Sequence, residues 1–390
     1  MSITTPASPP SPFDTLAQQW TLIGVICVAA ASFLGLPVIL GALADLRGLS
    51  PEQLGQIASA ETLGMAITAA LSPWLLSRVQ ARTLIGLGMV TLALCNLASC
   101  VVSGFAPFLA VRLGASVASG LAMPAAVACL GVTSRPERAF SWAVGAQVST
   151  SAAELFAFTY AARHFGVPGI YASLTLLTLL AGAAALRLAH LPRVSSGPAR
   201  HLPLDRPAKA GLAAVLLLFA CIGVYWAFIE RVGVLAHLSA EDVGLWLAIS
   251  NVPALLASLG APWLAERLGE RRMLLLGLGL AALVPLGLLL PLNPTGYLLN
   301  LGLFVLLWNA LMVVQMAVLG RWDAQGLAVG LTPSAQAFGL ALAPLLAGEL
   351  AEQRGYPAAM ALASGFALLA LLSTWIAFRE RHSAAVPVQA

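Results

Sequence analysis

The sequence predicts an all-α membrane protein whose twelve transmembrane helices form two pseudo-symmetric halves of six. Three observations lead to this prediction. The 390 residues are 59% hydrophobic and only 9% charged, whereas soluble domains carry about 25% charged residues. The apolar residues fall into twelve blocks, each close to the roughly 20 residues that a helix needs to cross a bilayer. The second half of the chain also repeats features of the first.

Each apolar block is expected to be a helix, because backbone groups inside a bilayer have no water to bond. An outer-membrane barrel would show short alternating segments, which the chain lacks. The first block is interpreted as a true span and not as a signal peptide, since residues 1–18 contain no Lys or Arg and the apolar run continues to Leu43. The predicted spans are 19–43, 52–77, 83–103, 106–132, 139–162, 168–188, 211–232, 240–265, 272–291, 295–319, 326–350 and 356–378.

Positive charge predicts the orientation of these spans. Fifteen of the twenty basic residues lie on the side that holds both termini, and four lie on the other side. Basic loops remain in the cytoplasm, so both termini are expected to be cytoplasmic in a bacterial inner membrane. The net charge of +4 therefore reflects topology, and no nucleic-acid partner is expected.

A Pro-, Ser- and Arg-containing segment between spans six and seven divides the chain. It is predicted to be a cytoplasmic linker between the two six-helix halves. The resulting organisation is an N-terminal tail (1–18), a first half (19–188), the linker (189–210), a second half (211–378) and a C-terminal tail (379–390).

The repeat is visible when the chain is shifted by 189 residues. Residues 49–88 then align with 238–277 without a gap, with eleven identities. A Gly-x-Pro pattern also recurs, at Gly166 and at Gly355. These matches predict parallel repeats related by an axis along the membrane normal. The identities include Ser50/Ser239, Glu52/Glu241, Gly55/Gly244, Trp74/Trp263, Arg78/Arg267 and Arg82/Arg271.

One loop carries a family resemblance. PWLAERLGERR at 262–272 resembles the G-x-x-x-D-R-x-G-R-R loop of the major facilitator superfamily, with Pro262 in place of the leading glycine. The first-half copy, PWLLSRVQAR at 73–82, has Ser77 in place of the acid. The resemblance implies the twelve-helix fold of that superfamily and alternating-access transport. It also implies that the loop holds the halves together in the outward-facing state, through Arg78, Arg82, Glu266, Arg267 and Arg271.

Three charged residues lie deep within predicted spans, where a charge costs about 2.5 to 3.5 kcal/mol. They are Glu61, Arg112 and Glu154, each on a polar helical stripe. The stripes are expected to line a shared aqueous site. Two carboxylates and one guanidinium leave an odd negative charge, and a proton is its simplest neutraliser. We hypothesise that Glu61 or Glu154 carries a proton, while Arg112 pairs with the other or with an anionic substrate. The alternative is a static Arg112 pair that braces spans four and five.

Other polar and aromatic residues within spans are candidates for binding a neutral or aromatic solute, with helix packing as the alternative for each. Glu230 and Arg231 are interpreted as interfacial. The candidates are Gln147, Ser151, Tyr225, Trp226, Asn251, Trp308, Asn309 and Gln336.

Other chemistry finds no support in the sequence. No Walker lysine motif is present, every histidine lies at a span end, in a loop or in the tail, and the five cysteines lie in apolar blocks without metal-ligand spacing. We therefore expect no enzyme, metal or cofactor, with a proton gradient as the energy source.

The resemblance and the charges together predict a monomeric secondary transporter that moves a small organic solute through the lipid bilayer. The missing G-P-x-x-G-G pattern of drug/proton antiporters favours uptake. Efflux of amphipathic compounds is the first alternative, and a non-transporting receptor or scaffold is the second.

Overall fold

The computed structural model describes residues 11–189, 204–290, 293–322 and 327–385. Within these ranges the secondary structure is entirely helical, as the sequence predicts. Nine helical stretches in the described part of the chain are long and apolar enough to cross a membrane. One of them, α6, contains two spans, and α3 and α10 complete the predicted set of twelve.

The first half begins with a span made of two helices, because Gly35 and Pro37 interrupt it. Thr15 caps its start and accepts the Gln18 N–H. The helices of this half are α1 (Leu16–Leu34), α2 (Leu36–Arg47), α3 (Pro51–Arg78), α4 (Ala81–Val101), α5 (Phe105–Gly131) and α6 (Pro136–Ala185).

The second half repeats this plan, except that its broken span is the second one, at Ser250. Asp205 caps its first helix, which starts within the predicted linker. The helices are α7 (Arg206–Leu235), α8 (Ala240–Ile249), α9 (Asn251–Leu268), α10 (Glu270–Gly287), α11 (Pro294–Trp322), α12 (Leu327–Arg354) and α13 (Tyr356–Ala385). The last helix therefore extends beyond the predicted span end at 378, and linker residues 190–203 lie outside the described residues.

The local conformation confirms the repeat. Ser50 and Ser239 each cap a helix by accepting an N–H from the first turn. Gly166 and Gly355 both have positive φ, 66° and 81°, which favours glycine. At Gly166 the helical conformation breaks within α6, which separates spans five and six. Gly355 separates α12 from α13 in the same way.

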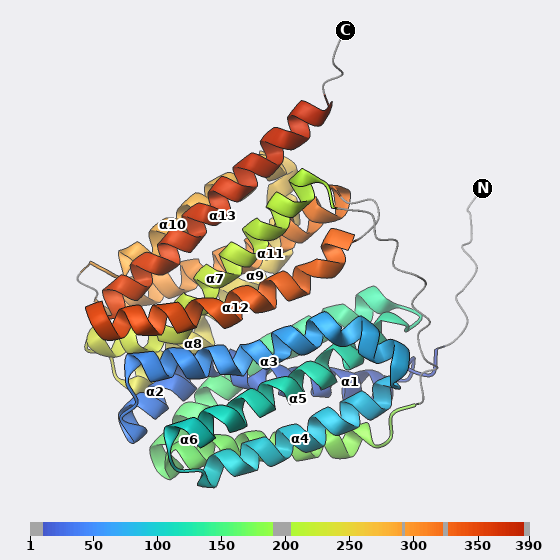
Figure 1. The fold of residues 1–390 in the computed structure, drawn as a ribbon, viewed down its shortest axis with the longest axis vertical. Coiled ribbons are helices and arrows are strands. Elements are labelled where there is room, and N and C mark those ends of the chain that lie inside the picture. The colour runs from blue at the N-terminus through green and yellow to red at the C-terminus, as the bar shows by residue number, and fades with distance from the viewer. Residues whose placement is uncertain (1–10, 190–203, 291–292, 323–326, 386–390) are drawn as a thin grey trace.

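The two halves meet at one end and diverge at the other (Figure 1). We call the end that holds Gly48, Gly166, His237 and Gly355 the closed end. The opposite end, where α1 and α7 start and α13 finishes, is the open end. Among the described residues, the hydrogen bonds and ion pairs that join the halves lie at the closed end or near the middle of the spans.

Candidate functional site

Two close helix crossings join the halves at the closed end. Gly55 on α3 lies against Gly348 on α12, and a Cβ built on Gly55 would stand 2.8 Å from the Gly348 Cα. Gly244 on α8 lies against the side chain of Thr159 on α6, where an added Cβ would meet the Thr159 hydroxyl. The repeat identity Gly55/Gly244 thus has a physical reason, because each glycine lets a helix of the opposite half pack closely against it.

Charged residues form a second set of contacts between the halves. Arg231 on α7 donates to both carboxylate oxygens of Asp45 on α2, at 2.6 and 3.0 Å. The same guanidinium binds the neighbouring Glu230, at 2.5 and 2.8 Å. At the same end, Arg163 on α6 forms an ion pair with Glu241 on α8. We call Asp45, Glu230 and Arg231 the closed-end ion cluster.

An aromatic cluster lies farther along the interface. The Trp226 Nε1–H donates to the Phe33 carbonyl across the halves, at 3.1 Å. Trp308 stands edge-on to both rings, with centroid distances of 5.7 Å to Trp226 and 6.4 Å to Phe33. The regular helical bond to this carbonyl is missing, because Pro37 has no N–H to donate to it. The break between α1 and α2 therefore creates the acceptor that Trp226 uses.

Arg112 lies inside the first half and is fully buried. Its Nε and Nη2 bind the two Glu61 oxygens, at 2.6 and 2.9 Å. The remaining N–H groups reach polar side chains of neighbouring helices, so all five donors have acceptors. Those acceptors are Asn96 Oδ1 at 3.0 Å, Ser99 Oγ at 3.2 Å and Ser32 Oγ at 3.0 Å.

This network corrects one expectation. The stripe that carries Glu61 and Thr68 was expected to face a shared aqueous site, but both residues are buried against α5. The physical reason is Arg112 itself, because a buried guanidinium needs a carboxylate partner and draws Glu61 toward it. Among the described residues Arg112 pairs with Glu61 and thereby joins α5 to α3, whereas the static pair considered as an alternative would have joined α5 to α6.

Glu154 lies apart from Arg112. It is 6% exposed on α6, and its Oε2 has no hydrogen-bond partner. The Cys27 thiol of α1 and the Thr150 hydroxyl lie close to it. An ionised carboxylate at such a position costs several kcal/mol, which favours the protonated form. Within the described part of the chain, Glu154 is thus the deep charge of the first half for which no cation partner is found.

The other predicted solute ligands differ in their surroundings. Tyr225 is fully buried within the second half, where its hydroxyl donates to Asn300 and its ring stacks on Phe304. The Asn251 side-chain amide donates to the Leu247 and Ala248 carbonyls of α8, across the break before α9, and the Asn309 amide donates to a carbonyl of its own helix. These three side chains therefore have structural partners. Ser151 is buried on α6, while Gln147 and Gln336 are partly exposed on α6 and α12.

The residues that the family resemblance assigns to gating lie at the open end. Arg78 covers the Trp74 ring and Arg267 covers the Trp263 ring, so the repeated tryptophan and arginine form a cation–π pair in each half. Arg82 donates to the Leu186 carbonyl, at 2.6 Å. Glu266 and Arg271 are exposed. Their gating role in another conformation remains a prediction.

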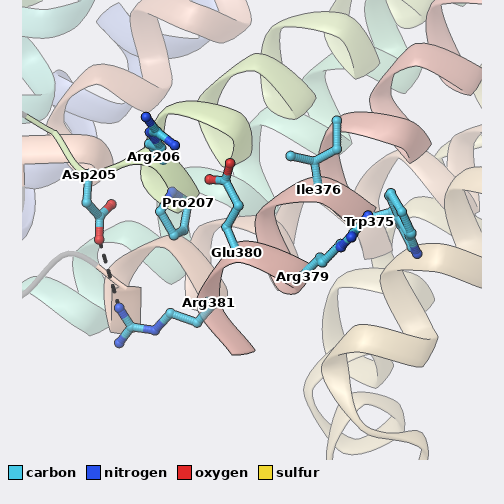
Figure 2. Close-up of a pocket in the computed structure, with 8 residues that line it drawn as sticks. All are labelled: Asp205, Arg206, Pro207, Trp375, Ile376, Arg379, Glu380 and Arg381. Atoms are coloured by element: carbon cyan, nitrogen blue, oxygen red, sulfur yellow. Dashed lines mark ion pairs between the residues drawn. The ribbon is translucent and has the colours of Figure 1, made fainter. Parts of the chain in front are cut away.

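A pocket of about 490 Å³ also lies at the open end, where Arg381 approaches Asp205 (Figure 2). Its lining comes from the start of α7 and the end of α13, together with the capping Asp205. Both helices belong to the second half, so this pocket lies away from the interface between the halves.

The comparisons with known proteins agree with this architecture. The sequence profile described as Major Facilitator Superfamily matches residues 21–322 and 211–390. The chain belongs to this superfamily, and it is a transporter and not an enzyme. No curated relative matches it by sequence.

Solved structures of the same fold include the nucleoside transporter NupG, at 12% identity and a TM-score of 0.77, covering 94% of this chain and 100% of that one. A D-xylose-proton symporter has 16% identity and a TM-score of 0.74, with 94% and 98% covered. A bacterial homologue of the human lysosomal transporter Spinster, inward-facing and occupied, has 13% identity and a TM-score of 0.76, with 94% and 97% covered.

Sequence reasoning missed Asp45, Asn96 and Ser99. Asp45 lies near a span end, where acidic residues are common, so nothing local distinguishes it. Asn96 was detectable in principle, because an amide deep in an apolar block indicates a polar partner.

Proposed function

We propose that this protein is a proton-coupled secondary transporter that moves a small organic solute across the bacterial inner membrane by alternating access, with Glu154 as the proton-carrying group. Glu61 and Arg112 act in this proposal as a fixed brace within the first half. The transporter works as a monomer, without a cofactor.

The observation that carries the proposal is the contrast between the two buried carboxylates. The Arg112 guanidinium is fully occupied within its network, so it is not available to neutralise Glu154. A carboxyl group without a cation is neutral when buried and ionises when water reaches it. A change between two accessibilities would therefore make Glu154 bind and release a proton once in each cycle.

The positive charge of the loops supports cytoplasmic termini. In that orientation the open end faces the cytoplasm, and the conformation is inward-facing. The closed-end contacts then seal the outer side. Arg78, Arg82 and Arg267 of the predicted loops make contacts within their own halves in this state, which is compatible with a latch that forms only in the outward-facing state.

The aromatic cluster of Phe33, Trp226 and Trp308, with Gln147 and Gln336 on facing halves, favours a neutral solute with an apolar or aromatic face. The similarity in fold to a nucleoside transporter and to a D-xylose-proton symporter supports the choice of such solutes for assay. Nucleosides and pentoses are thus the first compounds to assay.

The test is transport into proteoliposomes that contain a pH-sensitive dye. Labelled nucleosides and pentoses are added under an imposed proton gradient, to the wild type and to Glu154→Gln. We expect the variant to lose solute-driven acidification and accumulation while retaining solute exchange. Glu137→Gln, which changes an exposed carboxylate on the same helix, serves as the matched control. Coupling that is intact in Glu154→Gln would contradict the assignment of the proton site.

Efflux of amphipathic compounds is the second candidate function, because Trp308, which packs edge-on against the buried Trp226, is a partly exposed aromatic ring near the interface. Everted vesicles with an acidic lumen distinguish it, since an exporter accumulates an externally added amphipathic dye in them as protons leave the lumen down the outward-directed gradient. A receptor or scaffold would show neither activity, and Glu154→Gln would then have no effect on it.

A further inference from the structure

A cavity separate from the aromatic cluster lies at the closed end. Its volume is about 410 Å³, within the range of small-molecule sites. Residues of α2 and α6 line it from the first half, and residues of α7 and α8 line it from the second half. Val38, Ala42 and Leu46 give it an apolar wall. The cavity therefore exists only while the closed end is closed.

The charges around this cavity do not balance. Three carboxylates line it: Asp45, Glu230 and Glu241. Two guanidinium groups oppose them, Arg163 in the lining and Arg231 bonded to two of the carboxylates. One negative charge is in excess. The nearby Asp242, which accepts from the lining residue Ser239, adds to it.

We propose that this closed-end cavity binds small amphipathic organic cations, such as aryl- or alkylammonium ions, and that a bound cation holds the two halves in the arrangement seen here. The ammonium group is attracted by the excess carboxylate charge, and the apolar portion packs on Val38, Ala42 and Leu46. A ligand that binds one conformation increases the population of that conformation. Such cations would thus slow the transport cycle from the side opposite the open end.

The test measures binding of benzyltrimethylammonium by titration calorimetry, with the protein in nanodiscs of zwitterionic lipid at low ionic strength. Neopentylbenzene, a neutral molecule of the same shape, and benzenesulfonate, an anion, are the comparison ligands. We expect saturable binding of the cation alone, weakening roughly threefold or more on addition of 0.5 M salt because screening shortens the range of the attraction.

Three variants separate charge from conformation. Glu241→Gln removes the excess charge and should weaken cation binding roughly three- to tenfold, whereas Arg163→Gln should strengthen it by about the same factor. The double variant lacks the Arg163–Glu241 ion pair but restores the wild-type charge, so it should bind like the wild type. If the ion pair acts only by holding the closed end shut, all three variants lose affinity alike, and the proposal fails.

A steric variant tests the location. Ala240 lines the cavity and is exposed at the start of α8, so Ala240→Trp fills the space without disturbing buried packing. It should reduce cation affinity at least tenfold. Unchanged affinity in this variant, or equal binding of neopentylbenzene by the wild type, would also overturn the proposal. Because the assay measures binding and not transport, its failure is distinguishable from failure of the proposed proton coupling.

Discussion

Two buried arginines, Arg112 and Arg231, are each neutralised by a carboxylate, but they lie in different parts of the molecule. Each forms a two-point contact with a carboxylate, Arg112 with Glu61 and Arg231 with Asp45. Arg112 and all its partners belong to the first half. Arg231 and Asp45 belong to opposite halves. A pair within one half survives a rigid-body movement of the halves, whereas a pair between them must break whenever the closed end opens.

The composition of the closed-end ion cluster fits a contact that breaks and re-forms. Asp45 has 51% of its side chain exposed, so its carboxylate can be hydrated when the contact opens. Arg231 retains Glu230, which moves with it on the same helix. Neither ion is left buried without a partner, which is the most costly outcome for a charge. In the Arg112 network both ions are buried, so neither would be hydrated if the pair separated.

The largest effect is expected from breaking the Arg112 network. Glu61→Leu leaves a buried guanidinium without its carboxylate and should lower the free energy of unfolding by about 3 to 5 kcal/mol. The double variant Glu61→Leu/Arg112→Met removes both charges and should recover most of that loss. Denaturation of the purified protein in detergent measures both values. Equal stability of the single and double variants would show that the charges are not coupled.

A wedge at the closed end should have the next largest effect. In Gly55→Val the added side chain collides with the Pro344 carbonyl and with Gly348, which should disfavour the closed arrangement by about 1 to 3 kcal/mol. Gly86→Val, where nothing lies within 4 Å of an added Cβ, is the matched control. The measurement is the alkylation rate of a cysteine introduced at Ala162, which should rise only in the Gly55 variant.

Loss of the Arg231–Asp45 contact between the halves should have a smaller effect. Asp45→Asn leaves Arg231 paired with Glu230, so closure of the closed end should weaken by only about 1 kcal/mol or less, as for half-exposed ion pairs. The same alkylation assay reports the change, which should diminish at high salt. Asp242→Asn, a change at the same end but outside the contacts between halves, should have no effect. A loss of folding stability as large as in Glu61→Leu would contradict this assignment.

The smallest effect on stability is expected from a change at Asp14, in the segment before α1. Asp14 accepts the Ser134 and Ser11 N–H groups, both at 2.7 Å, and these hydrogen bonds hold its pKa below the usual aspartate value. A lowered folded-state pKa contributes stability that is present at neutral pH and is lost as the pH falls through that pKa. Asp14→Asn should therefore be slightly destabilising at pH 7, with the difference vanishing in acid. A difference that grows as the pH falls would contradict it.

The sequence predicted the architecture well, because bilayer thickness and the repeat constrain it strongly. The twelve spans and the two halves were visible in hydropathy and identity, and the repeat matches Ser50/Ser239 and Gly166/Gly355 proved to be helix caps and helix breaks. Glu61, Arg112 and Glu154 stood out because charges in apolar spans need an explanation.

The grouping of these residues could not be predicted from the sequence. Helical periodicity places Glu61 on a stripe with Thr68 but does not say which neighbouring helix that stripe meets. The stripe packs against α5 because the buried Arg112 guanidinium requires a carboxylate partner. Glu230 and Arg231, interpreted as interfacial, are buried near the end of α7, and their contact with Asp45 depends on how the two halves dock, which local patterns do not contain.

The most direct test measures the distance between the two halves at both the closed end and the open end. In a background without the five native cysteines, spin labels at His164 and His237 report the closed end, and labels at Ser77 and Leu327 report the open end. Alternating access predicts that Gly55→Val lengthens the first distance and shortens the second. Lengthening at the closed end with no change at the open end, or two fixed distances, would contradict it.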